Sequence, residues 1–438
     1  MSQTGVMKEQ LRRLFERTLD ALAIAPALHR VLRLEGDTLA IGGERVDLTA
    51  VERLAVVALG KAANSMAAAA LDVVAPRNVD GLLISAASPA GKLAGFDSSV
   101  GGHPYPDEHS LRAAERALDL AARLSANDLV LYLLSGGGSA VCEMPVAAEI
   151  SLEDCRNLYR LLVECGAPIH DMNVVRKHLS AIKGGRLAVR AHPARQVTLY
   201  VSDVPDGEES SIASGPTMPD ESTVAECRDI LRRFDLHRRL PRSIGRLLDG
   251  HHIAETPKPG DERFARSSWH SVLDNHDGVA ALRDGAAALG WIVEIDRSVD
   301  DGPLERASDH LLGRLRVLKT ANPRRIVAIV SGGELSWPVT GDGLGGRNQA
   351  FVLDCAGKIA GENIAVLSSG TDGIDGNSPA AGAVADGETI ARARRIGHEA
   401  AGFQRRSDAF RYFDALDDAL VIGPTGNNVR DLRLLVAY

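Results

Sequence analysis

The sequence predicts an α/β protein made of two Rossmann-like α/β/α domains, each with a mostly parallel sheet, that face an interdomain cleft. Short apolar runs alternate with helical patterns along the chain. This rhythm is typical of parallel strands, because parallel neighbours need a crossover connection. The chain has 438 residues, which is too long for one ordinary core, so we expect two domains of roughly 200 residues each.

The N-terminal half begins with apolar residues at helical spacing, which predict a helix over about 6–33. A further helix is expected over 107–124, with Asp107 as its N-cap. The N-terminal helix could pack on either domain. Short β-like runs predict the strands of this half at 54–60, 81–86, 129–134 and 197–202.

A polar segment with prolines over about 236–266 is the predicted connection between the domains, which we place at 1–240 and 260–438. A second α/β series follows it. Its strands are predicted at 269–274, 291–295, 325–330, 364–369 and 419–423.

Composition excludes several classes of protein. A net charge of −8 with a pI near 5.9 offers no basic face for a nucleic acid. No apolar run approaches the roughly 20 residues of a membrane helix, and the N-terminus lacks the pattern of a signal peptide. The five cysteines include no Cys-x-x-Cys pair, so we expect reduced core residues. We therefore expect a cytoplasmic protein without a membrane or nucleic-acid partner.

Glycine-rich turns follow most of the predicted strands. In open α/β sheets ligands bind beyond the carboxyl ends of the strands, and glycine lets the backbone approach an anion closely. The alternative is that these turns are ordinary tight connections from strand to helix. Two of them begin with Ser-Gly-Gly, and their residues are the predicted anion-binding groups: Ser135, Gly136, Gly137, Gly138 and Ser139, then Ser331, Gly332, Gly333 and Glu334.

A few cationic residues are placed where they could meet an anion. Lys61 follows the glycine that ends the strand at 54–60. Arg347 opens a helical stretch after a glycine loop, with Asn348 beside it as a further binding candidate. Arg176 and Lys183 lie in a segment that could also be a plain amphipathic helix with its basic residues in water.

Four aspartates, Asp203, Asp206, Asp372 and Asp375, follow predicted strands in glycine-rich loops. Carboxylates in such loops suit Mg²⁺, which is often held by one or two of them together with substrate phosphates. Asp203 and Asp372 are the predicted metal ligands. Taken singly, each aspartate could equally form an Asx turn or cap a helix.

Common nucleotide and hydrolase signatures are absent from the sequence. No Gly-Lys pair is followed by Ser or Thr, so there is no Walker A loop. Residues 341–346 match Gly-x-Gly-x-x-Gly, but the next predicted strand ends in Leu-Ser-Ser without the acidic residue that would hold a ribose. The loop instead suggests another anion-binding helix start.

Several long strings closely resemble the class II glycerate kinases, which carry a C-terminal MOFRL domain. The strings are "GGHPYPDEHS" (101–110), "NVVRKHLSAIKGGRLA" (173–188), "SDVPDGEESSIASGPTMPD" (202–220), "GDGLGGRNQAF" (341–351), "SSGTDGIDGNSPAAGAVAD" (368–386) and "GPTGNNVRDL" (423–432). They occur in the family's order and cover almost the whole chain. The resemblance implies a MOFRL region over about 325–432.

The resemblance implies a glycerate 2-kinase, which transfers the γ-phosphoryl of ATP to D-glycerate with Mg²⁺ as cofactor. It also implies that Lys61 and Arg347 match the family's proposed catalytic cations. Where relatives usually read Asp-Val-Pro-Gly-Asp, this chain reads Asp203-Val-Pro-Asp206-Gly, which leaves the equivalence of Asp206 in doubt.

Two other functions remain open at this point. The literal glycine match at 341–346 would fit an NAD(P)H-dependent hydroxypyruvate reductase. The same scaffold could instead serve as a non-catalytic sensor of a nucleotide or sugar phosphate. The residues do not define the oligomeric state, and a homodimer is one option.

Overall fold

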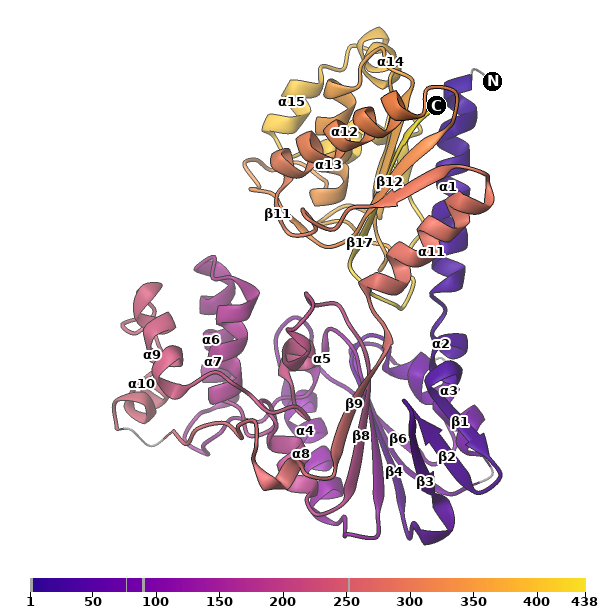
Figure 1. Ribbon diagram of the computed structural model, residues 1–438. Helices are drawn as coiled ribbons and strands as arrows, with labels where there is room; N and C mark the ends of the chain where they lie inside the picture. The colour runs from indigo at the N-terminus through magenta and orange to yellow at the C-terminus, as the bar shows by residue number, and fades with distance from the viewer. Residues whose placement is uncertain (1–2, 76, 89–90, 251–252) are drawn as a thin grey trace. The chain divides into compact units, whose positions relative to one another are not determined.

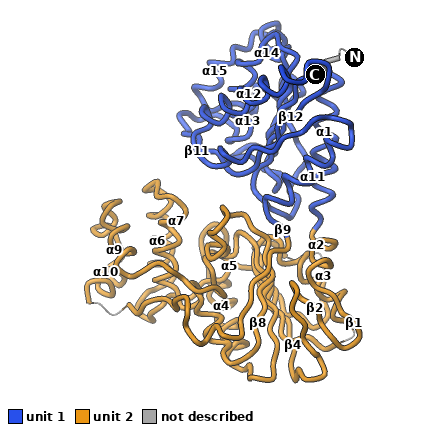
Figure 2. The backbone as a smooth tube through the Cα atoms, viewed as in Figure 1, with its two compact units in different colours: residues 1–23, 273–438 blue, residues 24–272 orange. Residues whose placement is uncertain are grey.

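The computed structural model describes residues 3–75, 77–88, 91–250 and 253–438. The chain forms two compact units: unit 1 contains residues 1–23 and 273–438, and unit 2 contains residues 24–272 (Figure 2). The N-terminal helix thus belongs with the C-terminal half, and the boundary lies after residue 272 rather than within 240–260. In the predicted connection, residues 251–252 lie outside the described residues.

Unit 2 contains a six-stranded sheet in the order β6-β5-β4-β7-β8-β9. Pairing is parallel from β6 to β8, as predicted. The strands are β4 (Leu54–Leu59), β5 (Val79–Ser85), β6 (Phe96–Val100), β7 (Leu129–Leu134), β8 (Arg195–Val201) and β9 (Ser267–Leu273). Strand β9 was predicted to open the second domain, but it is the edge strand of this sheet.

Helices cover both faces of the unit 2 sheet, with α3 on one face and α4 and α8 on the other (Figure 1). The central strands β4 and β7 are buried along their whole length, which explains why they read as continuous apolar runs. The helices are α3 (Ala63–Val74), α4 (Glu108–Ala122), α5 (Gly138–Val141) and α8 (Arg186–Ala191). Asp107 caps α4 in a capping box with Ser110, as predicted.

Four helices of unit 2 form a separate cluster with its own apolar core, to which each contributes, for example Leu158, Val174, Ile230 and Ile244. They are α6 (Leu152–Glu164), α7 (Ile169–His178), α9 (Val224–Arg233) and α10 (Arg242–Asp249). Helix α7 begins after Pro168. Gly184 and Gly185 have φ of 58° and 81° and lie between α7 and α8.

The predicted helix over 6–33 consists of two helices in different units, α1 (Gln3–Ala21) and α2 (Ile24–Val31). A small antiparallel sheet follows them, with β1 (Leu32–Glu35), β2 (Thr38–Ile41) and β3 (Glu44–Asp47). Short 3₁₀ segments at Leu48–Ala50, Glu209–Ser214 and Glu262–Phe264 complete unit 2.

Unit 1 contains a six-stranded sheet in the order β10-β12-β17-β14-β15-β16. Only β10 and β12 pair in parallel; β17 lies antiparallel between β12 and β14, so this sheet is mixed rather than mostly parallel. The strands are β10 (Ile292–Ile295), β12 (Val327–Ser331), β14 (Ile364–Gly370), β15 (Gly382–Asp386), β16 (Ala419–Leu420) and β17 (Asp431–Ala437).

Helices α1 and α11 (Asn275–Ala288) lie along one face of the unit 1 sheet, and α12 (Leu304–Ala321) and α13 (Arg347–Lys358) along the other (Figure 1). The remaining elements are β11 (Gly302–Pro303), β13 (Leu335–Ser336), α14 (Thr389–Arg395), α15 (Ala400–Arg405) and α16 (Ala409–Asp414).

Within the described part of the chain, no helix combines the length and apolar character needed to cross a membrane. All five cysteines are free, as predicted. Burial raises the pKa of the Cys142 thiol to about 12, so this thiol stays protonated at neutral pH.

Candidate active site

The turns after β4 and β7 are locked together at the carboxyl edge of the unit 2 sheet. Gly60 has φ of 117°, and a Cβ there would lie 2.4 Å from the backbone oxygen of Ser135, so only glycine fits. The backbone N–H of Lys61 donates to the carbonyl of Gly136 at 2.9 Å. The Ser135 Oγ accepts from the N–H of Ala62 at 2.9 Å. These bonds fix the base of Lys61 against the Ser135–Ser139 turn.

The side chains of Lys61 and Asp203 both lie against the glycines of this turn. A Cβ on Gly137 would lie 3.0 Å from Cγ of Lys61, and a Cβ on Gly136 would lie 1.7 Å from Oδ2 of Asp203. Burial, with a contribution from the charge of Lys61, lowers the pKa of His103 nearby. The structure therefore brings a cation, a carboxylate and a glycine-rich turn together where β4, β7 and β8 end.

Arg176 and Lys183 lie behind this turn, around the buried ring of Tyr159. The Tyr159 hydroxyl donates to the carbonyl of Ser139 at 3.1 Å and also contacts the Glu143 carboxylate. Lys183 is 1% exposed and forms an ion pair with Glu143. The Arg176 guanidinium stacks over the Tyr159 ring at 4.5 Å. These contacts assign Lys183 to support of the turn, since its ammonium is buried against a protein carboxylate.

Glu143 is a residue that the sequence reasoning missed. It is 2% exposed and accepts hydrogen bonds from Ser180 at 2.6 Å and from the N–H of Met144 at 2.9 Å. A lone glutamate directly after the apolar string Ala-Val-Cys was the available signal, because a carboxylate is rarely buried without partners.

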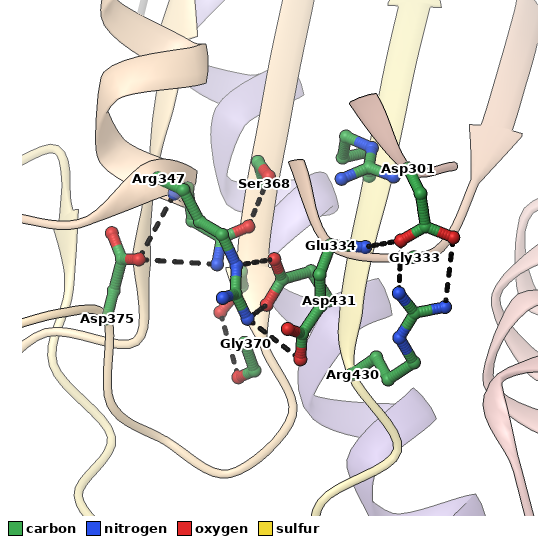
Figure 3. Close-up of polar contacts among 12 residues, drawn as sticks. Asp301, Gly333, Glu334, Arg347, Ser368, Gly370, Asp375, Arg430 and Asp431 are labelled. Carbon is green, nitrogen blue, oxygen red and sulfur yellow. Dashed lines mark hydrogen bonds and ion pairs between the residues drawn. The ribbon is translucent and has the colours of Figure 1, made fainter. Parts of the chain in front are cut away.

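In unit 1, Arg347 is held by two carboxylates (Figure 3). Its Nε donates to Oδ2 of Asp431 at 2.5 Å, and its Nη2 lies 2.9 Å from Oε1 of Glu334. Burial alone lowers the pKa of the guanidinium, but the neighbouring carboxylates, Asp431 above all, together outweigh burial and raise the pKa above its ordinary value. Asp431 was missed because strand β17, which carries it, was not predicted.

The Ser331–Glu334 turn has its backbone amides already occupied. The N–H of Gly332 donates to Oδ1 of Asp300 at 3.1 Å, and the N–H of Gly333 donates to Oδ1 of Asn275 at 3.0 Å. The N–H of Glu334 donates to Asp301 at 3.1 Å. The Ser331 hydroxyl also donates to Asp300, at 3.1 Å. The predicted role of Ser331, Gly332, Gly333 and Glu334 as anion donors therefore has no open amide to support it.

Asn348 lies in the first turn of α13, and Asp375 accepts hydrogen bonds from the first amides of that helix. Asp375 accepts from the backbone N–H groups of Asn348 and Gln349 at 3.1 and 2.9 Å, which is the helix-capping alternative considered for the aspartates. Asn348 is 2% exposed and accepts a hydrogen bond from Ser368, so its side chain is part of the interior. Burial raises the pKa of Asp375 to about 6, against the lowering effect of these amides.

The glycine loop at 341–346 packs against its own unit. A Cβ on Gly341 or Gly343 would lie 2.6 or 2.5 Å from the carbonyl oxygen of Arg406. Close approach of two backbone segments explains these glycines, and a dinucleotide is not needed to explain them.

The second predicted metal ligand, Asp372, lies near Asp431. A Cβ on Gly370 would lie 3.3 Å from Oδ1 of Asp372 and 3.5 Å from Oδ1 of Asp431. Over the described residues, no group of three or more His, Cys, Asp or Glu side chains is arranged to hold a metal ion. One or two carboxylates beside a glycine-rich turn are a ligand set that fits Mg²⁺, which often takes its other ligands from substrate phosphates and water.

Comparison with known proteins agrees with the resemblance. The family model of a domain of unknown function, DUF4147, matches residues 10–249, and that of the MOFRL family matches residues 327–431. A D-glycerate 2-kinase of Thermotoga maritima is 34% identical over 87% of this chain and 90% of its own length. A protein of Agrobacterium vitis named as a hydroxypyruvate reductase is 36% identical over 88% of this chain and 99% of its own.

A solved structure of a glycerate kinase from Thermotoga maritima superposes with a TM-score of 0.84 at 30% identity, covering 99% of this chain and 100% of the other. Matches of this identity and coverage extend over both units. The chain therefore belongs to the family of MOFRL-containing glycerate kinases.

Proposed function

We propose that this protein is a glycerate 2-kinase, which transfers the γ-phosphoryl of ATP to D-glycerate and yields 2-phosphoglycerate and ADP. The observation that carries the proposal is the meeting of Lys61, the Ser135–Ser139 turn and Asp203 at the carboxyl edge of unit 2. Phosphoryl transfer needs little covalent chemistry from the enzyme. It needs aligned oxygens and neutralised charge, which a cation and backbone donors supply.

Lys61 neutralises charge on the transferred phosphoryl group. Its side chain is exposed, and its backbone is anchored to the carbonyl of Gly136. Glycine lets the backbone of the turn approach an anion closely, so the proposal assigns the amides of Gly136, Gly137 and Gly138 to phosphate oxygens.

Arg347 is the second catalytic cation in the proposal. Its Nε and Nη2 contact Asp431 and Glu334. A guanidinium has five N–H donors, and the proposal assigns a further one to an oxygen of glycerate or of the phosphoryl group. The two carboxylates fix the plane of the guanidinium, which lowers the entropy lost when a substrate oxygen binds.

The candidate Mg²⁺ ligands of the proposal are Asp203 in unit 2 and Asp372 in unit 1. A bound Mg²⁺ would reduce the negative charge of the phosphates. Asp203 supports this role by its position against Gly136, beside the amides assigned to the phosphates.

The direct test is an enolase-coupled assay with ATP, Mg²⁺ and D-glycerate, because enolase consumes 2-phosphoglycerate but not the 3-isomer. We expect turnover that depends on all three components. A folded protein that releases no ADP with D-glycerate would refute the proposal and leave the sensor alternative.

The reductase alternative has one supporting observation, the name of the Agrobacterium vitis relative. The glycine loop that suggested it packs against Arg406. We expect no oxidation of NADH or NADPH with hydroxypyruvate, measured by absorbance at a protein concentration that gives full kinase turnover.

A further inference from the structure

A cavity of about 400 Å³ lies in unit 2. Its walls come from α7, the end of β8, the segments 207–211 and 218–222, Pro259 and Trp269 of β9. This volume is typical of sites for small organic ligands. We propose that the cavity binds the nucleoside part of the phosphoryl donor, its purine ring and ribose. The inference rests on the proposed kinase function and adds where the donor sits.

Flat apolar groups form one part of the cavity wall. Trp269 and Tyr200 line it together with Met218. The Trp269 indole N–H donates to the carbonyl of Thr217 at 3.0 Å, so the ring is held in one orientation. A fixed indole face presents apolar area at little entropic cost, which suits stacking on a purine.

The charges of the cavity favour an uncharged ligand part. Lys177 is the one lysine or arginine among the described residues that line it, and its ammonium lies 3.0 Å from Asp220. Burial alone would raise the pKa of Asp220, but the Lys177 charge and hydrogen bonds from Ser222 and Thr256 lower it, so this pair is ionised and internally compensated.

The remaining carboxylates leave the cavity acidic. Glu208, Glu209 and Glu221 line it, opposed by His170 with a ring nitrogen 4.0 Å from Glu208. Such a lining repels a triphosphate or the glycerate carboxylate. It can accept hydrogen bonds from ribose hydroxyls and from an exocyclic amino group. The acidic lining therefore favours the uncharged nucleoside inside the cavity and keeps the phosphates outside it.

A short hydrogen-bonded path joins the cavity to the turn assigned to the phosphates. Asn173 lines the cavity, and its Oδ1 accepts from the Ser214 hydroxyl at 3.0 Å. The Ser214 hydroxyl is 2.7 Å from that of Ser139. A nucleoside in the cavity can therefore direct its phosphates towards the Ser135–Ser139 turn.

The test measures donor binding apart from catalysis. Isothermal titration calorimetry with adenosine and with ADP is applied to the wild-type protein, Trp269→Leu and Ser211→Phe, the latter chosen to fill the cavity from a second wall. We expect each variant to weaken ADP binding by about tenfold or more. Trp291→Leu, the same kind of exchange in unit 1, should bind ADP like the wild type.

Kinetics provide the second readout. In both cavity variants the KM for ATP should rise by about tenfold, while the KM for D-glycerate changes less than twofold. Thermal unfolding identifies any variant that fails to fold, and the other variant then decides the result. Wild-type ADP affinity in a folded variant, or no adenosine binding by the wild-type protein, would overturn this site. Absence of kinase turnover would instead overturn the proposed function, and adenosine binding would still decide the cavity.

Discussion

The two Ser-Gly-Gly turns share a sequence but differ in what lies against them. In unit 2, the glycines of the Ser135–Ser139 turn lie against the side chains of Lys61 and Asp203. In unit 1, the amides of the Ser331–Glu334 turn donate to Asp300, Asn275 and Asp301. The comparison teaches that glycine at the end of a strand makes a close approach possible, whether to a ligand or to the protein's own side chains.

The two proposed catalytic cations also differ in their surroundings. Lys61 is exposed beside its turn, whereas Arg347 is an element of a carboxylate network that includes the buried Asp431. Substitution of Lys61 should therefore affect catalysis alone, whereas substitution of Arg347 should affect both catalysis and stability.

The largest expected effect is that of Lys61→Ala on turnover. Loss of a charge that acts in the transition state should lower kcat by about two orders of magnitude or more, with an unchanged free energy of unfolding. The enolase-coupled assay and urea denaturation measure the two quantities. Lys92→Ala, at another exposed lysine, is the matched control. Wild-type turnover of Lys61→Ala would remove this residue from the mechanism.

Arg347→Ala should lower both turnover and stability. It leaves the Asp431 carboxylate, 2% exposed, without its main partner, and breaking one partner of a buried pair costs about 3 kcal/mol. We expect this loss in the free energy of unfolding together with a kcat at least tenfold lower. Arg316→Ala, at an exposed pair with Glu362, should stay within about 0.5 kcal/mol of the wild type. A stable but inactive Arg347→Ala would contradict the structural part of the comparison.

The contribution of Asp375 to the stability of unit 1 should depend on pH. Its pKa is about 6 in the folded protein against an ordinary 3.8, because of burial. Between these values the folded protein holds a proton that the unfolded chain releases, so the stability from this group falls as the pH rises from about 4 to 6. The total loss should be about 3 kcal/mol, given 1.36 kcal/mol for each pKa unit.

Urea denaturation across this pH range, compared with Asp375→Asn, isolates the contribution of Asp375 from that of other titrating groups. The difference in free energy of unfolding between wild type and variant should change with pH in this window. A constant difference would mean that the Asp375 carboxyl titrates normally.

The smallest expected effect is that of Asp300→Ala, which removes the acceptor of the Gly332 amide and the Ser331 hydroxyl. Leaving these groups unsatisfied should cost about 1 to 2 kcal/mol in the free energy of unfolding. Asp284→Ala, whose side chain is 67% exposed, should change it by less than about 0.5 kcal/mol. An Asp300→Ala protein as stable as the control would show that the turn in unit 1 does not depend on its acceptors.

Much of unit 2 could be predicted from the sequence because the central strands of its sheet are buried along their length. Continuous apolar residues marked β4, β7 and β8, and parallel strands end at one edge, so the proximity of Lys61 and Asp203 followed. Strand β9 was assigned to the other unit because sequence order alone does not show which sheet an edge strand joins.

The interior of unit 1 was less accessible to prediction. Strand β17 carries Asp431 and Arg433, both buried, and such polar residues obscure the apolar pattern of a central strand. The acceptors of the second turn lie 32 and 58 positions from the amides they bind, in Asp300 and Asn275. Contacts of this kind depend on tertiary structure, which local periodicity does not encode.

The central place of β17 has a consequence for biosynthesis. The sheet of unit 1 needs residues 431–437 between β12 and β14, and one face of that sheet packs against α1, which is made long before them. Residues 24–272 can condense while translation continues. Helix α1 must wait, with its apolar side uncovered, until some 400 further residues have been made. The uncovered side of α1 therefore exposes the nascent chain to misassembly and to chaperone capture.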